Sequence, residues 1–466
     1  MKLKRFEVPG LAHYSYAIEA AGEAVVIDPQ RDIDVYTAYA AANGLRISHV
    51  LETHIHADYA SGARELAETT GAELLLSGHD RAQDFMYRFP HQAFRNGEQL
   101  RLGDLRFVAL HTPGHTPEHL SFLLYDAQRG AEPVALFSGD FVFVGSLGRP
   151  DLLGEKAKRK LAESLYESLK NKIAALPDSV EVYPAHGAGS MCGSGMDSSR
   201  AQSTLGYERQ FNPFFLEADK TAFVARILGN VPPFPDYYRR MKRVNSEGPK
   251  ILRGLPGNAP MALSEFQTAI SGEDAAVVDL RPPGAFGAAH IPGAFNIGAG
   301  PNLSTWAAWV VPYDRPIFLA GNDGTDYEDA IRSLVRVGLD EVSGYLGGGI
   351  RAWIEAGIGW ATIPQISVAE MQERAAKGAF LLDVRSDGEW ESGHVKGATH
   401  IMGGELPKRT AELPGNTSIH VICGSGYRSS VAASVLARAG FRKMVNVSGG
   451  MAAWNQQRLP TAKDSN

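Results

Sequence analysis

The chain has 466 residues, a formal net charge of −6, 44% hydrophobic residues and 21% charged residues. This length predicts about three domains at roughly 150 residues each, and the composition excludes a disordered or fibrous chain. No basic block and no run of about 18 apolar residues occurs, so we expect neither a nucleic-acid partner nor a membrane span. The N-terminus lacks the apolar run of a secretion signal, and the only cysteines, Cys192 and Cys423, fit a reducing compartment; we therefore expect a cytoplasmic protein.

The first half of the chain alternates short apolar runs with polar loops. Residues 24–27, 74–76 and 135–137 are β-like runs, and most histidines lie in loops just after such runs. This pattern predicts a layered α/β fold whose chemistry is carried by loops. Residues 230–260 are rich in Pro, Gly and basic residues without clean periodicity, so they are interpreted as a linker, with a domain boundary near residue 255.

Four loop segments of this half carry potential metal ligands. The segment THIHADY, residues 53–59, contains His54, His56 and Asp58, and three later segments supply the other candidates. In chain order, those later candidates are His115 in HTPGHTPEHL, Asp140 in FSGD and His186 in YPAHGAG. A single histidine pair is commonly ordinary surface or packing, but four such segments predict a metal site.

These segments resemble the metallo-β-lactamase superfamily, whose usual motif is HxHxDH followed by further His, Asp and His ligands. The resemblance spans roughly residues 8–215 and implies an αββα sandwich, which we assign to residues 1–254. Here Tyr59 stands where the motif has its last histidine. Because that histidine normally serves the second metal, the substitution disfavours a two-zinc hydrolase.

Two further segments, THIHADYASGARELA and GSLGRPDLLG, resemble the persulfide dioxygenases, also called sulfur dioxygenases. The resemblance implies one Fe(II) per protomer, held by His54, His115 and Asp140. Two imidazoles and one carboxylate form a facial triad that leaves positions open for a persulfide sulfur and dioxygen. The neighbouring residues then line the pocket or orient the ligands: His56, Asp58, Tyr59, His186 and Arg149.

The second half of the chain repeats itself at a period of about one hundred residues, which indicates a duplicated domain. The segment DLRPPGAFGAAHIPGAFNI (279–297) matches DVRSDGEWESGHVKGATHI (383–401), and GYLGGGIRAW (344–353) matches VNVSGGMAAW (445–454). Alternating strand-like and helix-like runs predict two α/β domains with parallel sheets, over residues 255–361 and 362–466.

In the second copy, VICGSGYRSSVAASVLARAG places Cys423 between an apolar strand and a helix. Backbone N–H groups and the helix N-terminus would stabilise a thiolate there, and Arg428 would add a positive charge. Two alternatives to a reactive sulfur-carrying cysteine are a small core cysteine without chemistry and the cysteine loop of a dual-specificity phosphatase. Together with DVRSDGEWESGHVKGA and VSGGMAAW, the loop resembles the rhodanese family over about residues 363–460. The resemblance implies that Cys423 carries sulfane sulfur as a persulfide, cradled by Gly424, Ser425, Gly426 and Tyr427.

In the first copy the equivalent loop is LAGNDGTDYEDA, which aligns Gly321 with Cys423 and Asp326 with Arg428. Without a nucleophile this copy resembles an inactive rhodanese. Packing, placement of the two active domains and dimerisation all remain open as its role, and we expect a homo-oligomer.

Cys192 lies in the glycine-rich segment AHGAGSMCGSGM, just after the His186 motif. This stretch resembles the dioxygenase domains of persulfide dioxygenase and rhodanese fusions. Its glycines leave room for a substrate, so a catalytic role in handling sulfur is one interpretation. A buried, inert thiol is the other.

Together these features predict an enzyme that oxidises a low-molecular-weight thiol persulfide, of glutathione, coenzyme A or a similar carrier, with O₂ to sulfite. The rhodanese domain would convert sulfite to thiosulfate or work in the reverse direction. The alternatives are a thioester hydrolase of the glyoxalase II kind, using a metal-bound hydroxide, and a sulfur carrier that consumes no oxygen.

Overall fold

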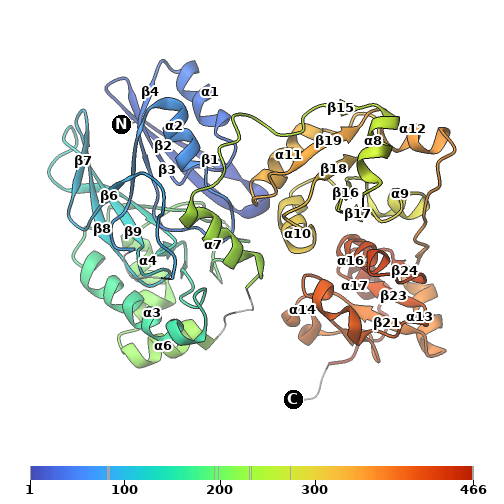
Figure 1. Ribbon diagram of the computed structural model, residues 1–466. Coiled ribbons are helices and arrows are strands. Elements are labelled where there is room, and N and C mark those ends of the chain that lie inside the picture. The colour runs from blue at the N-terminus through green and yellow to red at the C-terminus, as the bar shows by residue number, and fades with distance from the viewer. Residues whose placement is uncertain are drawn as a thin grey trace. The chain divides into compact units, whose positions relative to one another are not determined.

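The computed structural model describes residues 2–80, 84–193, 195–197, 199–229, 231, 234–272 and 274–463. The chain forms two compact units (Figure 1). The first comprises Met1–Gly254 with the short segment Val335–Gly338, and the second comprises Leu255–Leu334 with Leu339–Asn466. Among the described residues, no helix combines the length and apolarity needed to cross a bilayer.

The first unit contains two six-stranded mixed sheets. The first sheet has the order β1 (Lys2–Val8), β2 (His13–Ala20), β3 (Glu23–Ile27), β4 (Arg46–Leu51), β5 (Glu73–Ser77) and β6 (Gln92–Phe94). The second sheet has the order β14 (Ser203–Thr204), β13 (Glu181–Pro184), β10 (Pro133–Gly139), β9 (Leu120–Asp126), β8 (Leu105–His111) and β7 (Gln99–Leu102). Neighbours are antiparallel from β1 to β3 and parallel from β3 to β6.

Three apolar clusters place these sheets in the middle of four layers. One cluster joins residues of both sheets, such as Ile18, Val25, Phe107 and Phe122, and forms the core between them. The outer faces are covered by helices, with α1 (Asp34–Ala42) and α2 (Ala63–Thr70) on the first sheet and α3 (Glu155–Ser168), α4 (Leu205–Phe211) and α6 (Lys220–Gly229) on the second. This burial of both faces confirms the predicted αββα sandwich. The shorter elements are η1 (Pro9–Leu11), β11 (Val142–Phe143), β12 (Ser146–Leu147), η2 (Leu169–Ile173) and α5 (Pro213–Leu216).

The segment interpreted as a linker contains a helix that belongs to the first unit. Residues Tyr237–Glu247 form α7, and its side chains Tyr238, Met241, Lys242 and Asn245 are buried. Their spacing of three and four residues is that of one helix face. The sequence pattern hid this face because Lys242 and Asn245 are polar, and both are buried through tertiary hydrogen bonds rather than apolar packing.

The second unit contains two five-stranded parallel sheets with the same strand order. The first is β15 (Pro260–Met261), β19 (Val342–Leu346), β18 (Ile317–Ala320), β16 (Ala276–Asp279) and β17 (Phe295–Asn296). The second is β20 (Gln365–Ile366), β24 (Met444–Val447), β23 (Ile419–Ile422), β21 (Phe380–Asp383) and β22 (Thr399–His400). All these strand pairs are parallel, which confirms the predicted duplicated α/β domain.

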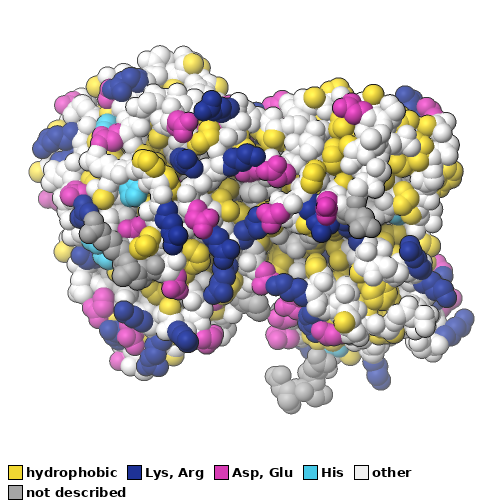
Figure 2. Space-filling model, in the orientation of Figure 1, with side chains coloured by type: hydrophobic (Ala, Val, Ile, Leu, Met, Phe, Trp, Pro, Cys, Tyr) yellow, Lys and Arg dark blue, Asp and Glu magenta, His cyan; other side chains and the backbone are white. Residues whose placement is uncertain are grey.

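The helices of the second unit repeat in the same way. They are α8 (Leu263–Ile270), α9 (Pro283–Ala288), α10 (Leu303–Val310), α11 (Tyr327–Val335), α12 (Gly349–Glu355), α13 (Val368–Ala376), α14 (Asp387–Ser392), α15 (Leu406–Arg409), η3 (Thr410–Glu412), α16 (Tyr427–Arg438) and α17 (Gly450–Gln456). The shared DxR motif has the same geometry in both copies. In each copy two guanidinium nitrogens of the arginine donate to the carboxylate of the aspartate, Arg281 to Asp279 and Arg385 to Asp383. On the surface drawn in Figure 2, basic and acidic side chains are intermixed rather than segregated.

Candidate functional site

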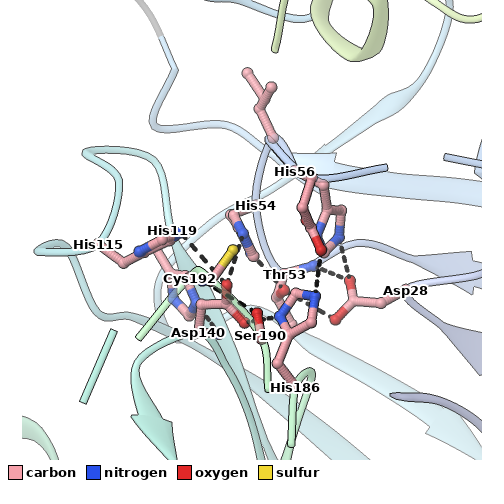
Figure 3. Close-up of polar contacts among 12 residues, drawn as sticks. Asp28, Thr53, His54, His56, His115, His119, Asp140, His186, Ser190 and Cys192 are labelled. Carbon is pink, nitrogen blue, oxygen red and sulfur yellow. Dashed lines mark hydrogen bonds and ion pairs between the residues drawn. The ribbon is translucent and has the colours of Figure 1, made fainter. Parts of the chain in front are cut away.

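Three predicted metal ligands come together in the first unit. His54 follows β4, His115 lies between β8 and β9, and Asp140 directly follows β10. The Asp140 Oδ2 atom lies 3.7 Å from His54 Nε2 and 3.4 Å from His115 Nε2. These three atoms are buried and have no hydrogen-bond partner among the described residues, and Figure 3 shows the three side chains grouped together. Since buried polar atoms are normally satisfied, the arrangement fits a cation bound by all three.

The Nδ1 atoms of His54 and His115 make hydrogen bonds that leave each Nε2 atom available as a metal ligand. The His115 Nδ1–H donates to the Arg149 carbonyl over 2.8 Å, and the His54 Nδ1–H donates to Thr53 Oγ1 over 2.9 Å. Thr53 Oγ1 in turn donates to Asp28 Oδ2. Burial lowers the pKa of His115 to about 4 and that of His54 well below its usual value. Both rings are therefore neutral at pH 7, as metal coordination requires.

His186 occupies a different position, between two carboxylates. Its Nδ1 lies 2.7 Å from Asp140 Oδ1 and its Nε2 lies 2.7 Å from Asp58 Oδ2. Burial opposes charge on this ring, but the two carboxylates raise the pKa of His186 well above its usual value. Asp58, His186 and Cys192 form a second group of potential ligands whose atoms lie within 4.8 Å of one another. Both ring nitrogens of His186 lie within hydrogen-bond distance of carboxylates, so a cation in this second group would have to replace one of these bonds.

The two other motif side chains turn toward Asp28. His56 Nε2 lies 3.2 Å from Asp28 Oδ1, and the Tyr59 hydroxyl donates to the Asp28 carbonyl over 3.3 Å. Burial lowers the pKa of His56, but the Asp28 carboxylate outweighs this effect and raises it overall. Neither side chain joins the group of His54, His115 and Asp140.

Cys192 is fully buried beside this group rather than exposed to solvent. Figure 3 shows its sulfur on the side of His54 and Asp140, and Sγ lies 4.0 Å from the Tyr238 hydroxyl. Burial raises the pKa of the Cys192 thiol well above its usual value. The backbone of Arg149 ties this loop to the ligands, because its N–H donates to the Cys192 carbonyl and its carbonyl accepts from His115. Two guanidinium nitrogens of Arg149 donate to the two carboxylate oxygens of Asp151.

Helix α7 supports the loop that carries His54 and His56. Asn245 accepts a hydrogen bond from the Ser61 N–H and donates to the carbonyls of His56 and Tyr59. Lys242 Nζ donates to the Ile55 carbonyl over 3.0 Å, and burial lowers its pKa. These bonds fix the backbone between β4 and α2.

Replacing Asn245 by Ala should destabilise the first unit by about 3 kcal/mol, because three buried backbone groups lose their partner. The thermal transition of the full chain measures this effect. Asn43→Ala is the matched control, because the Asn43 amide is exposed and makes one local bond to the Tyr39 carbonyl. Equal transition temperatures for the two variants would show that α7 does not support the loop.

Several contributors to this site were missed from the sequence. Asp28 directly follows β3, with φ at +52°, and binds the Thr53 N–H and side chain. His119 Nε2 accepts from the Asp140 N–H, while its Nδ1 bonds Thr112. His13 is buried, with its ring centroid 4.1 Å from that of Tyr59. The run AVVIDP, an apolar strand ending in a carboxylate, was the available signal for Asp28.

The second unit presents Cys423 in a loop between β23 and the N-terminus of α16. Its Sγ is buried and accepts from the Gly426 N–H at 3.1 Å and from the Ser429 hydroxyl at 3.4 Å. Gly426 has a φ of +104°, a conformation that favours glycine. At Gly450, a Cβ atom would lie 2.2 Å from the Cys423 carbonyl oxygen, so only glycine allows α17 to approach this closely. The loop therefore directs the Gly426 N–H and the Ser429 hydroxyl at the sulfur.

The positive charge expected of Arg428 is paired with a carboxylate in the structure. Its two terminal nitrogens bind the two carboxylate oxygens of Glu389 at 2.6 and 2.7 Å. The bond to Arg428 lowers the pKa of Glu389 to about 2, so the pair is ionised and neutral overall. Through this ion pair Arg428 links the start of α16 to α14.

In the first copy the corresponding loop keeps its backbone frame. The Ile350 N–H donates to the Gly321 carbonyl, as the Met451 N–H does to the Cys423 carbonyl in the second copy. Gly321 offers no side chain, and Asp326, which replaces arginine, accepts from the Asp329 N–H. The first copy therefore keeps the backbone hydrogen bond of the loop but lacks the cysteine nucleophile.

Comparison with known proteins agrees with this architecture. A model described as the metallo-beta-lactamase superfamily matches residues 8–186, and one described as the rhodanese-like domain matches residues 262–356 and 367–457. A cytoplasmic hydroxyacylglutathione hydrolase from Arabidopsis thaliana is 35% identical over 189 residues, which span 40% of this chain and 67% of that protein. A probable metallo-hydrolase from Burkholderia pseudomallei is 31% identical over 218 residues, spanning 40% of this chain and 72% of that protein.

A crystal structure of a metallo-beta-lactamase from Staphylococcus aureus is 35% identical, with a TM-score of 0.65, and the match covers 74% of this chain and 98% of that chain. The match thus extends beyond the first unit. The chain therefore belongs to the metallo-β-lactamase superfamily through its first half, and its second half carries two rhodanese-like domains.

Proposed function

We propose that the first unit is a mononuclear iron persulfide dioxygenase and that the last domain is a thiosulfate sulfurtransferase. The observation that carries the first assignment is the set of three unpartnered ligand atoms on His54, His115 and Asp140. Two imidazoles and one carboxylate are the ligand set of non-haem Fe(II) oxygenases. We assign one Fe(II) per protomer to this set.

The alternative is a thioester hydrolase. One relative is named a hydroxyacylglutathione hydrolase and another a probable metallo-hydrolase, and both names favour hydrolysis. Three features of this chain oppose it. Tyr59 provides no imidazole for a second metal, and His186 is held between the Asp58 and Asp140 carboxylates. His56 is also turned to Asp28, which leaves a ligand set suited to one metal.

The proposed reaction converts a thiol persulfide, dioxygen and water to the free thiol and sulfite. A bound Fe(II) would supply the redox chemistry that couples dioxygen to sulfur. The protein would hold the two imidazoles neutral and fix their tautomers through Thr53 and the Arg149 carbonyl. We assign Asp58 and His186 to keeping the Asp140 carboxylate oriented, with its free oxygen toward the ligand group.

In the sulfurtransferase, the Cys423 thiolate would attack the outer sulfur of thiosulfate, release sulfite and retain that sulfur as a persulfide. Transfer to cyanide would form thiocyanate and restore the thiolate, and transfer to sulfite would regenerate thiosulfate. The Gly426 N–H and the Ser429 hydroxyl are in position to stabilise the anionic sulfur at each stage. This loop supports the assignment of Cys423 as the nucleophile and of residues 424–427 as its cradle.

The test is a substrate panel on protein purified without oxygen and analysed for metal. We expect one iron per chain, oxygen uptake with persulfides of glutathione or coenzyme A, and no turnover of acyl-glutathione thioesters. Two zinc ions per chain together with rapid thioester hydrolysis would support the hydrolase instead.

We further propose that Cys192 receives sulfur inside the first unit. A substrate persulfide anion would transfer its terminal sulfur to the Cys192 sulfur, and the Cys192 proton would leave with the departing carrier thiolate. The sulfur lies within 4.8 Å of the potential ligand atoms of Asp58 and His186, on the side of Asp140 in Figure 3, and this position supports the role. The complete burial of Cys192 confines the transfer to substrates that enter the site.

Replacing Cys192 by Ser should lower oxygen uptake per bound iron by roughly 10-fold, because the relay is lost while His54, His115 and Asp140 remain. Oxygen uptake and the ratio of sulfite to thiosulfate, both normalised to iron, measure this effect. Cys423→Ser is the matched thiol control. If Cys192→Ser equals the unmodified protein in both quantities and no persulfide forms on Cys192 in mass spectrometry, Cys192 is an inert packing residue.

A further inference from the structure

We infer that the cysteine-free rhodanese-like copy holds the sulfur-transfer loop of the other copy in its active geometry, with Asn296 as the positioning residue. This inference rests on the sulfur transfer proposed for Cys423. Both copies belong to one compact unit, and residues of the first copy bind α16, the helix that begins beside Cys423.

Asn296, at the end of β17 in the first copy, binds two serines of α16. The Ser430 hydroxyl donates to Asn296 Oδ1 over 2.5 Å, and the Asn296 backbone N–H donates to Ser434 Oγ over 3.0 Å. The Asn296 amide nitrogen donates to the carbonyls of Asp279 and Arg281. All of these groups lie in the interior, so the hydrogen bonds on both ends of the amide hold the side chain in one orientation.

A second contact reaches the cysteine loop itself. The Tyr427 hydroxyl donates to the Gly298 carbonyl of the first copy over 3.1 Å. A Cβ atom at position 298 would lie 3.3 Å from the Tyr427 ring, so the ring packs closely on the Gly298 backbone. At the far end of α16, the Arg438 guanidinium donates to the Gly293 carbonyl and lies 4.6 Å from the centroid of the Phe295 ring.

These contacts alternate along α16 with the groups that hold the sulfur. Ser429 donates to Cys423 Sγ, while Ser430, its neighbour in sequence, donates to Asn296. Tyr427, which binds Gly298, directly follows Gly426, whose N–H donates to Cys423 Sγ. A small rotation or shift of α16 would therefore move both sulfur donors. Because geometric errors of about 1 Å can lower a rate by roughly 100-fold, the first copy can control catalysis without a nucleophile of its own.

The test measures thiosulfate-to-cyanide sulfur transfer in full-length variants. Asn296→Ala and Ser430→Ala should each lower kcat/KM roughly 10-fold, and the double variant should show roughly the same 10-fold loss, because both substitutions remove one contact. Tyr427→Phe keeps the ring and removes only the bond to Gly298, so it should also reduce transfer. The matched control is Asn322→Ala, an exposed asparagine in the empty loop of the first copy.

A positional effect is separated from a loss of folding by two further readouts. The fraction of Cys423 that carries a persulfide after thiosulfate treatment, measured by mass spectrometry on folded protein, should fall in Asn296→Ala and stay unchanged in Asn322→Ala. Oxygen uptake by the first unit should be unchanged in both. Normal transfer in folded Asn296→Ala and Ser430→Ala would overturn the positioning role, and so would multiplicative losses in the double variant. Neither result would affect the proposed sulfurtransferase function. Absence of transfer in the unmodified chain would refute the sulfurtransferase function together with the positioning role.

Discussion

Cys423→Ser should abolish cyanide-dependent sulfur transfer, with a loss on the order of 1,000-fold or more, while iron content and oxygen uptake persist. The hydroxyl of serine is far less ionised than a thiol at neutral pH, so it cannot form the persulfide. The donors that face the sulfur would remain in place, because the Gly426 N–H and the Ser429 hydroxyl are unchanged. Thiocyanate formation from thiosulfate and cyanide measures the loss.

Cys192→Ser is the matched control for this experiment, since it removes the only other thiol of the chain. Transfer should continue in that variant because Cys192 belongs to the other compact unit. Gly321 cannot substitute for Cys423, as it has no side chain. Thiocyanate formation near the unmodified rate in Cys423→Ser would place the transfer chemistry elsewhere.

His115→Ala should abolish iron retention and oxygen uptake. The variant removes one of three protein ligands, which should weaken metal binding by more than the roughly 100-fold typical for losing an outer hydrogen-bond partner. Sulfur transfer should remain, because Cys423 lies in the second unit. Metal analysis after gel filtration, together with both activity assays, measures these effects.

His111→Ala is the matched control for this ligand. His111 lies four residues before His115, but its ring stacks on His79 at 3.9 Å and its Nε2 bonds the Pro117 carbonyl. It lies outside the group formed by His54, His115 and Asp140. Iron retention in a folded His115→Ala variant would mean that the ligand set is wrong, and loss of both activities would contradict independence of the two units.

The sequence allowed the fold and the loop chemistry to be predicted because both depend on local patterns. Apolar strand runs followed by His, Asp or Cys place those side chains at strand ends, and the duplicated DxR and GG segments reveal two copies of one domain. These patterns supplied several candidate ligands, and the resemblance to the persulfide dioxygenases implied the set of His54, His115 and Asp140.

What the sequence did not reveal depends on partners far apart in the chain. Glu389 neutralises Arg428 from 39 residues away, and Asn245 binds the loop after β4 from 184 or more residues away. Helix α7 was missed because its buried face includes Lys242, whose burial is supported by the Ile55 carbonyl. No periodicity encodes such pairings, and the contacts of Asn296 with α16 are of the same kind.

Oxygen uptake with a purified thiol persulfide tests the central claim most directly. With iron-loaded Cys423→Ser protein, which cannot convert sulfite to thiosulfate, we expect equal amounts of dioxygen consumed, carrier thiol released and sulfite formed. The rate should be proportional to bound iron and unchanged in Cys423→Ser. Release of thiol or sulfide without oxygen uptake, by protein whose iron content has been verified, would contradict the assignment of the first unit as a persulfide dioxygenase.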